Sequence, residues 1–298
     1  MAMAIQTQSL SKRYRSHTVL TNVTLNVPPG AVYALVGENG AGKTTLIKLL
    51  MNILQPTSGA GSVLGVPLNH VAGAAFEQIG YVSENQELPE SMTVKAFLAY
   101  VRGFYPNWDR ALEERLIREL ALPRDRKLKH LSRGMKMKAV LISVLAYHPP
   151  LIVLDEPFSG LDPLVRDEVI RGLIALRHET TLFLSSHDLA EIEPLATHVG
   201  YLENGKLLFS EEMSALASRF REIEIEIAEA WKFSNFLPTW LQPVTTPSTL
   251  RFVDTQFTEA TERDLAERFP NATRIAISPM SLKTIFLALA RSAETTAA

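Results

Sequence analysis

Residues 31–45 read AVYALVGENGAGKTT, and this stretch decides the fold class of the chain. Six apolar residues come first, three glycines follow, and Lys43, Thr44 and Thr45 lead into an apolar helical segment. The part from Gly37 to Thr44 matches the pattern G-x-x-x-x-G-K-[ST], which forms a phosphate-binding loop when a strand precedes it and a helix follows it. The stretch therefore predicts a nucleotide site.

The residue types in this loop suit a triphosphate. Glycines allow backbone N–H groups to turn toward phosphate oxygens, the helix that begins near Lys43 directs its positive end at them, and Lys43 adds a full charge. Thr44 offers a hydroxyl to a Mg²⁺ ion bound to the nucleotide. A plain glycine turn, the alternative, does not explain the lysine directly after it. We expect the nucleotide to contact Gly37, Glu38, Asn39, Gly40, Ala41, Gly42, Lys43, Thr44 and Thr45.

Two later segments follow the same plan, LIVLD at 151–155 and TLFLSSH at 181–187. Short apolar runs that end in a polar residue are typical of strands buried on both faces of a parallel sheet, where ligands bind beyond the carboxyl ends. We therefore expect Asp155 to hold Mg²⁺ and Glu156 to act as the general base toward water. Two solvated acids that begin a loop are the alternative.

The rest of the chain divides into regions of different pattern. Helical periodicity between about residues 92 and 148 predicts a helical insertion, and Asp109 is placed to cap a helix there. Strand patterns return after residue 210, at 222–229, 249–257 and 274–278, and Thr261 with Asp264 fits a capping box. The predicted fold class is α/β with a mostly parallel buried sheet in residues 1–215, a linker near residues 210–220, and a small α+β domain in residues 220–298.

Composition excludes several classes of protein. The chain has 30 Lys and Arg against 32 Asp and Glu, so a nucleic-acid partner is not expected. It has no cysteine, which excludes disulfides and thiolate metal sites. The first 15 residues lack the apolar core of a signal peptide, and the apolar runs stop far short of the roughly 18 residues that suggest a membrane span. We expect a cytoplasmic chain.

The ordered set of motifs resembles the ATP-binding subunits of ABC transporters over about residues 5–215. The set consists of Tyr14, the loop at 37–44, the segment Leu131-Ser132-Arg133-Gly134-Met135, Asp155 with Glu156, Ser159-Gly160-Leu161-Asp162, and His187. The resemblance implies a P-loop nucleoside triphosphatase fold, ATP and Mg²⁺ as cofactors, and ATP hydrolysis.

The resemblance also assigns a signature to residues 131–135. In this family the signature begins a helix whose amino end contacts the γ-phosphate held by the other subunit, and Ser132 and Gly134 suit that contact. Arg133 stands where the family usually has glycine, and Met135 where it usually has glutamine. A simple helix cap is the alternative for this segment. Ser159, Gly160, Leu161 and Asp162 are expected to form the dimer loop.

Three single residues take roles by resemblance. Tyr14 would stack on adenine, with a half-buried strand tyrosine as the alternative. His187 would contact the γ-phosphate and help to position the water. Glu84 stands where the family usually has a glutamine that reaches Mg²⁺ and water; a carboxylate can also bind Mg²⁺, and an acid in a solvated loop is the alternative.

These features predict an ATPase subunit that forms an ATP-dependent head-to-tail homodimer and powers a separate membrane permease, of the exporter type, at the inner face of the membrane. Five aromatic residues fall near one helical face: Phe97, Tyr100, Phe104, Tyr105 and Trp108. They either pack inside the helical insertion or form a groove that receives a short helix of the permease. The C-terminal domain is interpreted as dimer packing. Rival functions are an ABC-type ATPase acting on ribosomes or DNA, a P-loop small-molecule kinase, and a nucleotide-binding regulator.

Overall fold

A computed structural model describes residues 2–176, 180–228 and 236–297 of the chain. The chain divides into two compact units, Met1–Ser210 and Glu211–Ala298. It passes from the first to the second within strand β10 (Lys206–Glu212). In the described part of the chain, no helix has both the length and the apolar character that a bilayer crossing requires.

A six-stranded sheet forms the centre of the first unit, with the strand order β10-β9-β3-β8-β7-β6. Strand β3 runs parallel to β8 and β9, and β7 runs parallel to β6 and β8, so the predicted α/β class with a mostly parallel buried sheet is confirmed. The strands other than β10 are β3 (Val32–Val36), β6 (Ile79–Val82), β7 (Leu151–Leu154), β8 (Thr181–Ser186) and β9 (His198–Glu203).

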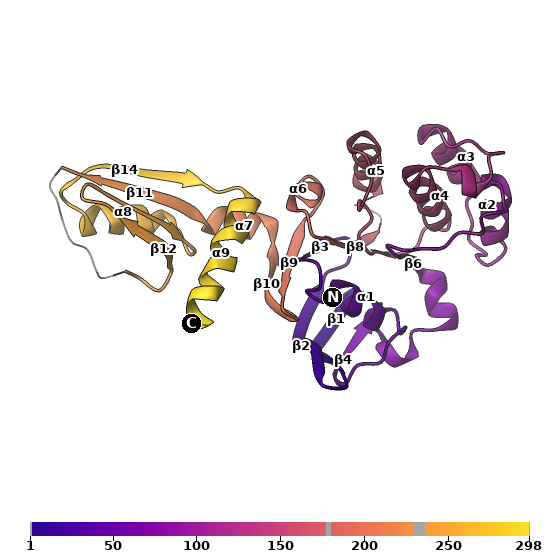
Figure 1. Ribbon diagram of the computed structural model, residues 1–298, viewed down its shortest axis with the longest axis horizontal. Coiled ribbons are helices and arrows are strands. Elements are labelled where there is room, and N and C mark those ends of the chain that lie inside the picture. The colour runs from indigo at the N-terminus through magenta and orange to yellow at the C-terminus, as the bar shows by residue number, and fades with distance from the viewer. Residues whose placement is uncertain (1, 177–179, 229–235, 298) are drawn as a thin grey trace. The chain divides into compact units, whose positions relative to one another are not determined.

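A second, antiparallel sheet of four strands, which the sequence patterns did not predict, lies in the same unit in the order β2-β1-β4-β5. Its strands are β1 (Ile5–Tyr14), β2 (His17–Val27), β4 (Ser58–Val63) and β5 (Val66–Pro67). This sheet and helix α1 (Lys43–Leu50) lie on one face of the large sheet. Three helices lie on the other face, namely α4 (Arg133–Leu145), α5 (Pro163–Leu176) and α6 (Leu189–Ile192) (Figure 1).

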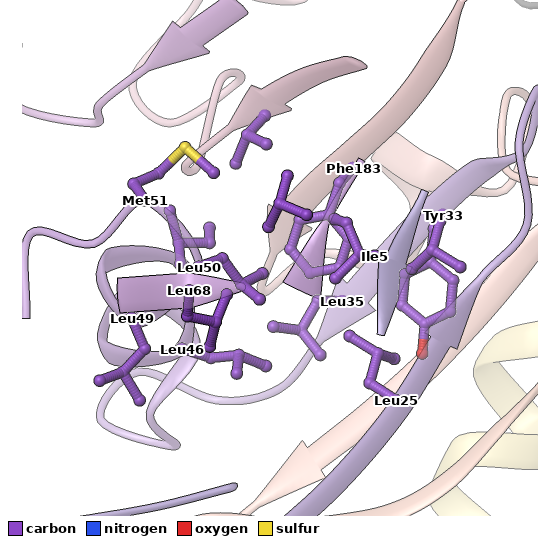
Figure 2. Close-up of a cluster of buried hydrophobic side chains, with 14 of the residues drawn as sticks. Ile5, Leu25, Tyr33, Leu35, Leu46, Leu49, Leu50, Met51, Leu68 and Phe183 are labelled. Atoms are coloured by element: carbon purple, nitrogen blue, oxygen red, sulfur yellow. The ribbon is translucent and has the colours of Figure 1, made fainter. Parts of the chain in front are cut away.

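The main hydrophobic core lies between α1, the antiparallel sheet and one face of the parallel sheet (Figure 2). Tyr33 and Phe183, from neighbouring strands, stack with ring centroids 5.5 Å apart, and both side chains are fully buried. Leu46 and Leu50 of α1 are also fully buried. Each large apolar side chain buried in this way contributes about 1.5–3 kcal/mol, so this core fixes the phosphate-loop helix against the sheet.

The segment with helical periodicity contains three helices that pack against one another (Figure 1). Asp109 caps the second of them, as predicted, because its Oδ1 accepts a hydrogen bond from Leu112 N at 2.9 Å. The helices of the first unit that follow α1 are α2 (Val94–Arg102), α3 (Arg110–Glu119), α4 (Arg133–Leu145), α5 (Pro163–Leu176) and α6 (Leu189–Ile192).

The second unit has a four-stranded antiparallel sheet with the order β12-β13-β11-β14. Its strands are β11 (Arg221–Ile227), β12 (Trp240–Thr245), β13 (Thr249–Asp254) and β14 (Ala272–Pro279), and its helices are α7 (Met213–Arg219), α8 (Glu259–Arg268) and α9 (Leu282–Ala297). Alternate residues Ile223, Ile225 and Ile227 of β11 enter its core. Residue 229, the end of the predicted 222–229 strand, lies outside the described residues.

Two local expectations differ from the structure. A linker is predicted near residues 210–220, where the structure has the end of β10 and helix α7. The capping box of α8 is formed by Thr258 as N-cap and Thr261 as the third helical residue, so the predicted pair of Thr261 with Asp264 was wrong. The chain enters this helix three residues earlier than the pattern indicated.

Candidate active site

Glycine conformations shape the loop between β3 and α1. Gly40 and Gly42 have φ values of 86° and 108°, in the left-handed region that glycine adopts without strain. A Cβ atom on Gly42 would lie 2.7 Å from Cδ2 of Leu20. Any larger residue at position 42 would therefore be strained by its backbone and would collide with β2.

The turn between β9 and β10 braces the same loop from outside. Gly205 N donates a hydrogen bond to Ala41 O at 3.1 Å. A Cβ on Gly37 would lie 2.2 Å from the carbonyl oxygen of Leu202, so the two backbones approach each other closely. The loop thus takes its shape both from its own glycines and from residues 202–205.

Lys43 is buried at the start of α1, with 5% of its surface exposed. Its Nζ donates to the carbonyl oxygens of Gly37 at 2.6 Å and Glu38 at 3.1 Å. The same Nζ lies 3.0 Å from Oε1 of Glu156. This ion pair compensates two buried charges that would each be costly alone.

Glu156 follows β7 and reaches toward the end of β8. Its φ of 48° is unusual for a residue with a side chain, and its N–H donates to Ser185 Oγ at 2.9 Å. Its Oε2 lies 2.8 Å from Nδ1 of His187. The carboxylate therefore lies between a cation and an imidazole, in a backbone conformation that the neighbouring strand stabilises.

Asp155 is fully buried beside Glu156. Its Oδ1 accepts hydrogen bonds from Ser185 Oγ at 2.8 Å and from Thr44 Oγ1 at 3.2 Å. Its Oδ2 is buried and has no hydrogen-bond partner among the described residues. Burial is the main cause that raises the pKa of Asp155, opposed by the bonds from Ser185 and Thr44.

The free Oδ2 next to the Thr44 hydroxyl fits a Mg²⁺ ion, which binds one or two carboxylates and completes its shell with substrate phosphates and water. No group of three or more acidic or histidine side chains in the described ranges forms a complete metal cage. A cation here would consequently need ligands from a bound phosphate compound.

Lys43, Thr44, Glu156 and His187 line one pocket of about 540 Å³, and Asp155 is buried directly behind Thr44 and Glu156. The pocket lining includes eight of the predicted nucleotide-binding or catalytic residues, together with Glu84, Ser159 and Val19. The full set is Val19, Asn39, Gly40, Gly42, Lys43, Thr44, Thr45, Glu84, Glu156, Ser159 and His187. A phosphate-binding loop, a lysine and a paired carboxylate and histidine thus face the same space, which suits binding and hydrolysis of a nucleoside triphosphate.

Comparison with known proteins decides the family. A protein-family model described as "ABC transporter" matches residues 20–159 of the chain. The bacitracin transport ATP-binding protein BcrA of Enterococcus faecalis is 31% identical over 226 residues, which cover 74% of this chain and 73% of that protein. The chain belongs to the ATP-binding subunits of ABC transporters. It is accordingly an ATPase.

Two further likenesses each cover about 70% of this ABC subunit. The Nod factor export ATP-binding protein I of Neorhizobium galegae is 32% identical over 212 residues, 69% of this chain and 61% of that protein. A solved structure titled as the ATP-binding subunit of an ABC transporter superposes with a TM-score of 0.65 at 31% identity, covering 72% of this chain and 92% of that one.

The predicted signature segment, residues 131–135, does not line this pocket. Ser132 caps α4, because its Oγ accepts a hydrogen bond from Met135 N at 3.2 Å. Ser132 and Arg133 are exposed, whereas Gly134 is buried against α5, where a Cβ would lie 2.7 Å from Val165 Cγ1. Within one chain, the signature is therefore separate from the phosphate-binding loop.

Arg133, the unusual signature residue of this ABC subunit, lies against the predicted dimer loop of the same chain. A Cβ on Gly160 would lie 2.7 Å from Nη1 of Arg133, and Gly160 has a φ of 66°. Asp162 caps α5 by accepting a hydrogen bond from Val165 N at 3.1 Å. Leu161 and Met135 are partly buried nearby. Arg133 thus connects the predicted signature to the predicted dimer loop.

One predicted residue of the ABC subunit lies outside the pocket, and one residue that contacts both acids was not predicted. Tyr14 ends β1 with 45% exposure and Lys12 Nζ 5.0 Å from its ring centroid, but it does not line the pocket. Ser185 was not predicted, although it bonds to both Asp155 and the Glu156 backbone. Two serines before His187 at the end of an apolar strand were the only signal for it.

Proposed function

We propose that two copies of this chain bind ATP between them and hydrolyse it to drive an exporter-type permease. The observation that carries the proposal is the position of Glu156, whose carboxylate contacts both Lys43 and His187 at the floor of the pocket. The name of the Nod factor relative, an export ATP-binding protein, supports the direction of transport. The permease would hold the subunit at the cytoplasmic face of the membrane.

Hydrolysis would proceed by in-line attack of water on the γ-phosphorus. Glu156 accepts a proton from the water while the water oxygen bonds to the γ-phosphorus. The bond between the γ-phosphorus and the bridging oxygen breaks, and its electron pair leaves with ADP. His187 holds the Glu156 carboxylate and orients the water. Lys43 and the N–H groups of the loop stabilise the charge that develops on the phosphate oxygens.

Mg²⁺ is proposed as the second cofactor besides ATP, because Asp155 has a buried oxygen without a hydrogen-bond partner among the described residues. Thr44 and Asp155 would hold the ion, with Glu84 on the pocket wall as the third candidate. The ion would supply positive charge that neutralises the triphosphate. Among the protein's own groups, Ser185 keeps the Asp155 carboxylate oriented toward Thr44.

The head-to-tail dimer is supported by the surface that carries the signature and the dimer loop. Ser132 and Arg133 are exposed there, and Leu164, an apolar residue at the start of α5, is 77% exposed. A partner that covers Leu164 would bring its own phosphate-binding loop to Ser132 and the α4 amino end. Two equivalent ATP sites would result.

The permease contact is supported by the aromatic residues of the helical segment. Phe97 is buried and Tyr105 stacks on Tyr147, so these two serve packing. Tyr100 and Phe104 are 56% and 61% exposed and pack edge to face at 5.2 Å. This exposed pair on and after α2 is the proposed docking point for a short helix of the membrane partner.

Substitution of Glu156 by glutamine tests the proposal. We expect E156Q to bind ATP, to lose at least about 100-fold in turnover, and to accumulate as an ATP-bound dimer in size-exclusion chromatography. The control E119Q removes an exposed carboxylate that pairs with Arg115 far from the pocket and should keep wild-type rates. An unchanged ATPase rate in E156Q would dismiss Glu156 as the base, and a monomer at saturating ATP would dismiss the shared sites.

A further inference from the structure

The second unit contains a pocket of its own that the ATPase function does not use. It has a volume of about 530 Å³, within the range of small-molecule sites. The side chains that matter here come from the start of β12, the end of β13 and helix α8. They are Trp240, Asp254, Asp264, Leu265, Glu267 and Arg268.

Asp254 is the decisive residue of this pocket. It ends β13, is 3% exposed, and lines the cavity. Its Oδ1 accepts a hydrogen bond from Gln256 N at 3.0 Å. No lysine, arginine or histidine in the described ranges forms an ion pair with it, and burial raises its pKa. A buried carboxylate without a counter-charge is costly unless a cation approaches from the pocket.

The charges around Asp254 have the same sign. Asp264 and Glu267 are exposed, three residues apart on α8, and therefore lie on one face of that helix. Among the described residues that line the pocket, the one cation is Arg268, whose guanidinium lies over the Trp240 ring at 5.5 Å from the centroid. The described lining residues therefore carry three carboxylates against one guanidinium and a net negative charge, unlike the ATP pocket, where Lys43 neutralises Glu156.

The walls of the pocket add an apolar contact. Trp240 stacks on Phe252 with ring centroids 4.0 Å apart, and Leu265 of α8 is buried beside it. No group of three or more acidic or histidine side chains in the described part of the chain is arranged to hold a metal ion. The combination of one buried carboxylate and an apolar wall suits an organic cation better than a bare metal ion.

We propose that this pocket binds a small organic cation, an ammonium or guanidinium group on a short apolar body, with Asp254 as the anchoring carboxylate. The cationic group donates hydrogen bonds to Asp254, and the apolar body packs against Trp240 and Leu265. Asp264 and Glu267 attract the cation to the opening. All of these residues belong to the second unit, so the proposal stands apart from the ATPase mechanism.

The test uses the full-length protein, n-butylammonium as the probe and n-butanol as its neutral counterpart. Saturation-transfer NMR titration measures the affinity of the protein for each probe. We expect butylammonium to bind at least about tenfold more tightly than butanol, and we expect its binding to weaken at high salt. The substitution Asp254→Asn keeps the acceptor for Gln256 N but removes the charge, and should weaken butylammonium binding at least about tenfold. Equal binding of the two probes would overturn the proposal.

Control variants separate this site from other effects. Glu222→Gln removes an exposed carboxylate of the same unit that pairs with Arg251, and butylammonium binding should not change. Glu267→Gln removes only a rim charge and should weaken binding less than Asp254→Asn. Loss of binding in Glu222→Gln, or full binding in a folded Asp254→Asn variant, would contradict the assignment. We expect Lys43→Ala to weaken ATP binding and to leave butylammonium binding unchanged, because Lys43 belongs to the first unit; the two proposals can therefore fail independently.

Discussion

Nδ1 of His187 lies 2.8 Å from Oε2 of Glu156, a contact that joins the ends of the neighbouring strands β8 and β7. The other carboxylate oxygen of Glu156 lies 3.0 Å from Lys43 Nζ. The proposed base is thus held at both oxygens, and its backbone is fixed in a left-handed conformation by Ser185. The geometry restricts the directions from which water can reach it.

Removal of the His187 imidazole should leave the Glu156 carboxylate without one of its two partners. We expect His187→Ala to lower the ATPase turnover number by about 100-fold or more, because Glu156 loses the partner that orients it. ATP affinity, measured by equilibrium binding, should change much less. His148→Ala is the matched control, since His148 contacts Asp109 away from the pocket and should leave turnover intact. Equal losses in both variants would contradict a role for His187.

Ser185 should influence both acids. Ser185→Ala removes the donor to Asp155 and the acceptor for Glu156 N, so it should destabilise the fold by about 1–3 kcal/mol. It should also raise the Mg²⁺ concentration needed for half-maximal ATPase activity. Ser143→Ala removes a buried hydroxyl that bonds only to Val140 O among the described contacts and should leave the Mg²⁺ requirement unchanged. A wild-type Mg²⁺ titration in Ser185→Ala would reject this prediction.

Gly134 should tolerate no side chain. A Cβ at this position would lie 2.7 Å from Val165, so Gly134→Ala should displace the start of α4 from α5 and lower both thermal stability and ATP-dependent dimerisation. Gly172 in α5 has open space around its Cβ position. Gly172→Ala should therefore stabilise the helix by about 0.5–1 kcal/mol. The prediction fails if calorimetry gives both variants the same melting temperature.

The buried charge of Asp155 predicts a pH dependence of stability. Because burial raises its pKa above the ordinary 3.8, the folded state keeps the proton over a range where the unfolded state has lost it. The free energy of unfolding should thus fall as the pH rises from about 4 through the raised pKa, and stay low above it. Asp155→Asn should be more stable than wild type at pH 7 in EDTA, with the advantage shrinking toward pH 4. Denaturant titrations between pH 4 and pH 7 measure the difference in the free energy of unfolding between Asp155→Asn and the wild type. A difference that is constant or reversed over this range would contradict the prediction.

The parallel sheet could be predicted because its strands are short unbroken apolar runs, such as residues 151–154, which are local signals. The antiparallel sheet could not. Strands β1 and β2 pair with several register shifts, and Ser9 and Asn22 within them have positive φ values. These irregularities break the alternation of apolar and polar residues on which a strand prediction depends.

The acidic and phosphate-binding residues of the site were predictable because each lies in a recognisable motif. Ser185 was not, since a serine signals nothing until the fold places it between two acids. The cap of α8 was missed because its pair is Thr258 with Thr261, whereas the usual pattern has an acidic or amide residue third. The cavity at Asp254 depends on β12, β13 and α8 together, and no stretch of sequence encodes it alone.

The contact of Leu202 and Gly205 with the phosphate-binding loop has a consequence for biosynthesis. A ribosome delivers the chain from its amino end, so the glycine loop emerges long before the hairpin that holds it in place. A nascent chain that stops before β9 carries the complete nucleotide motif and lacks the support that shapes it. We therefore expect ATP binding to require that the last strands of the unit have left the exit tunnel, so that unfinished chains do not compete for nucleotide.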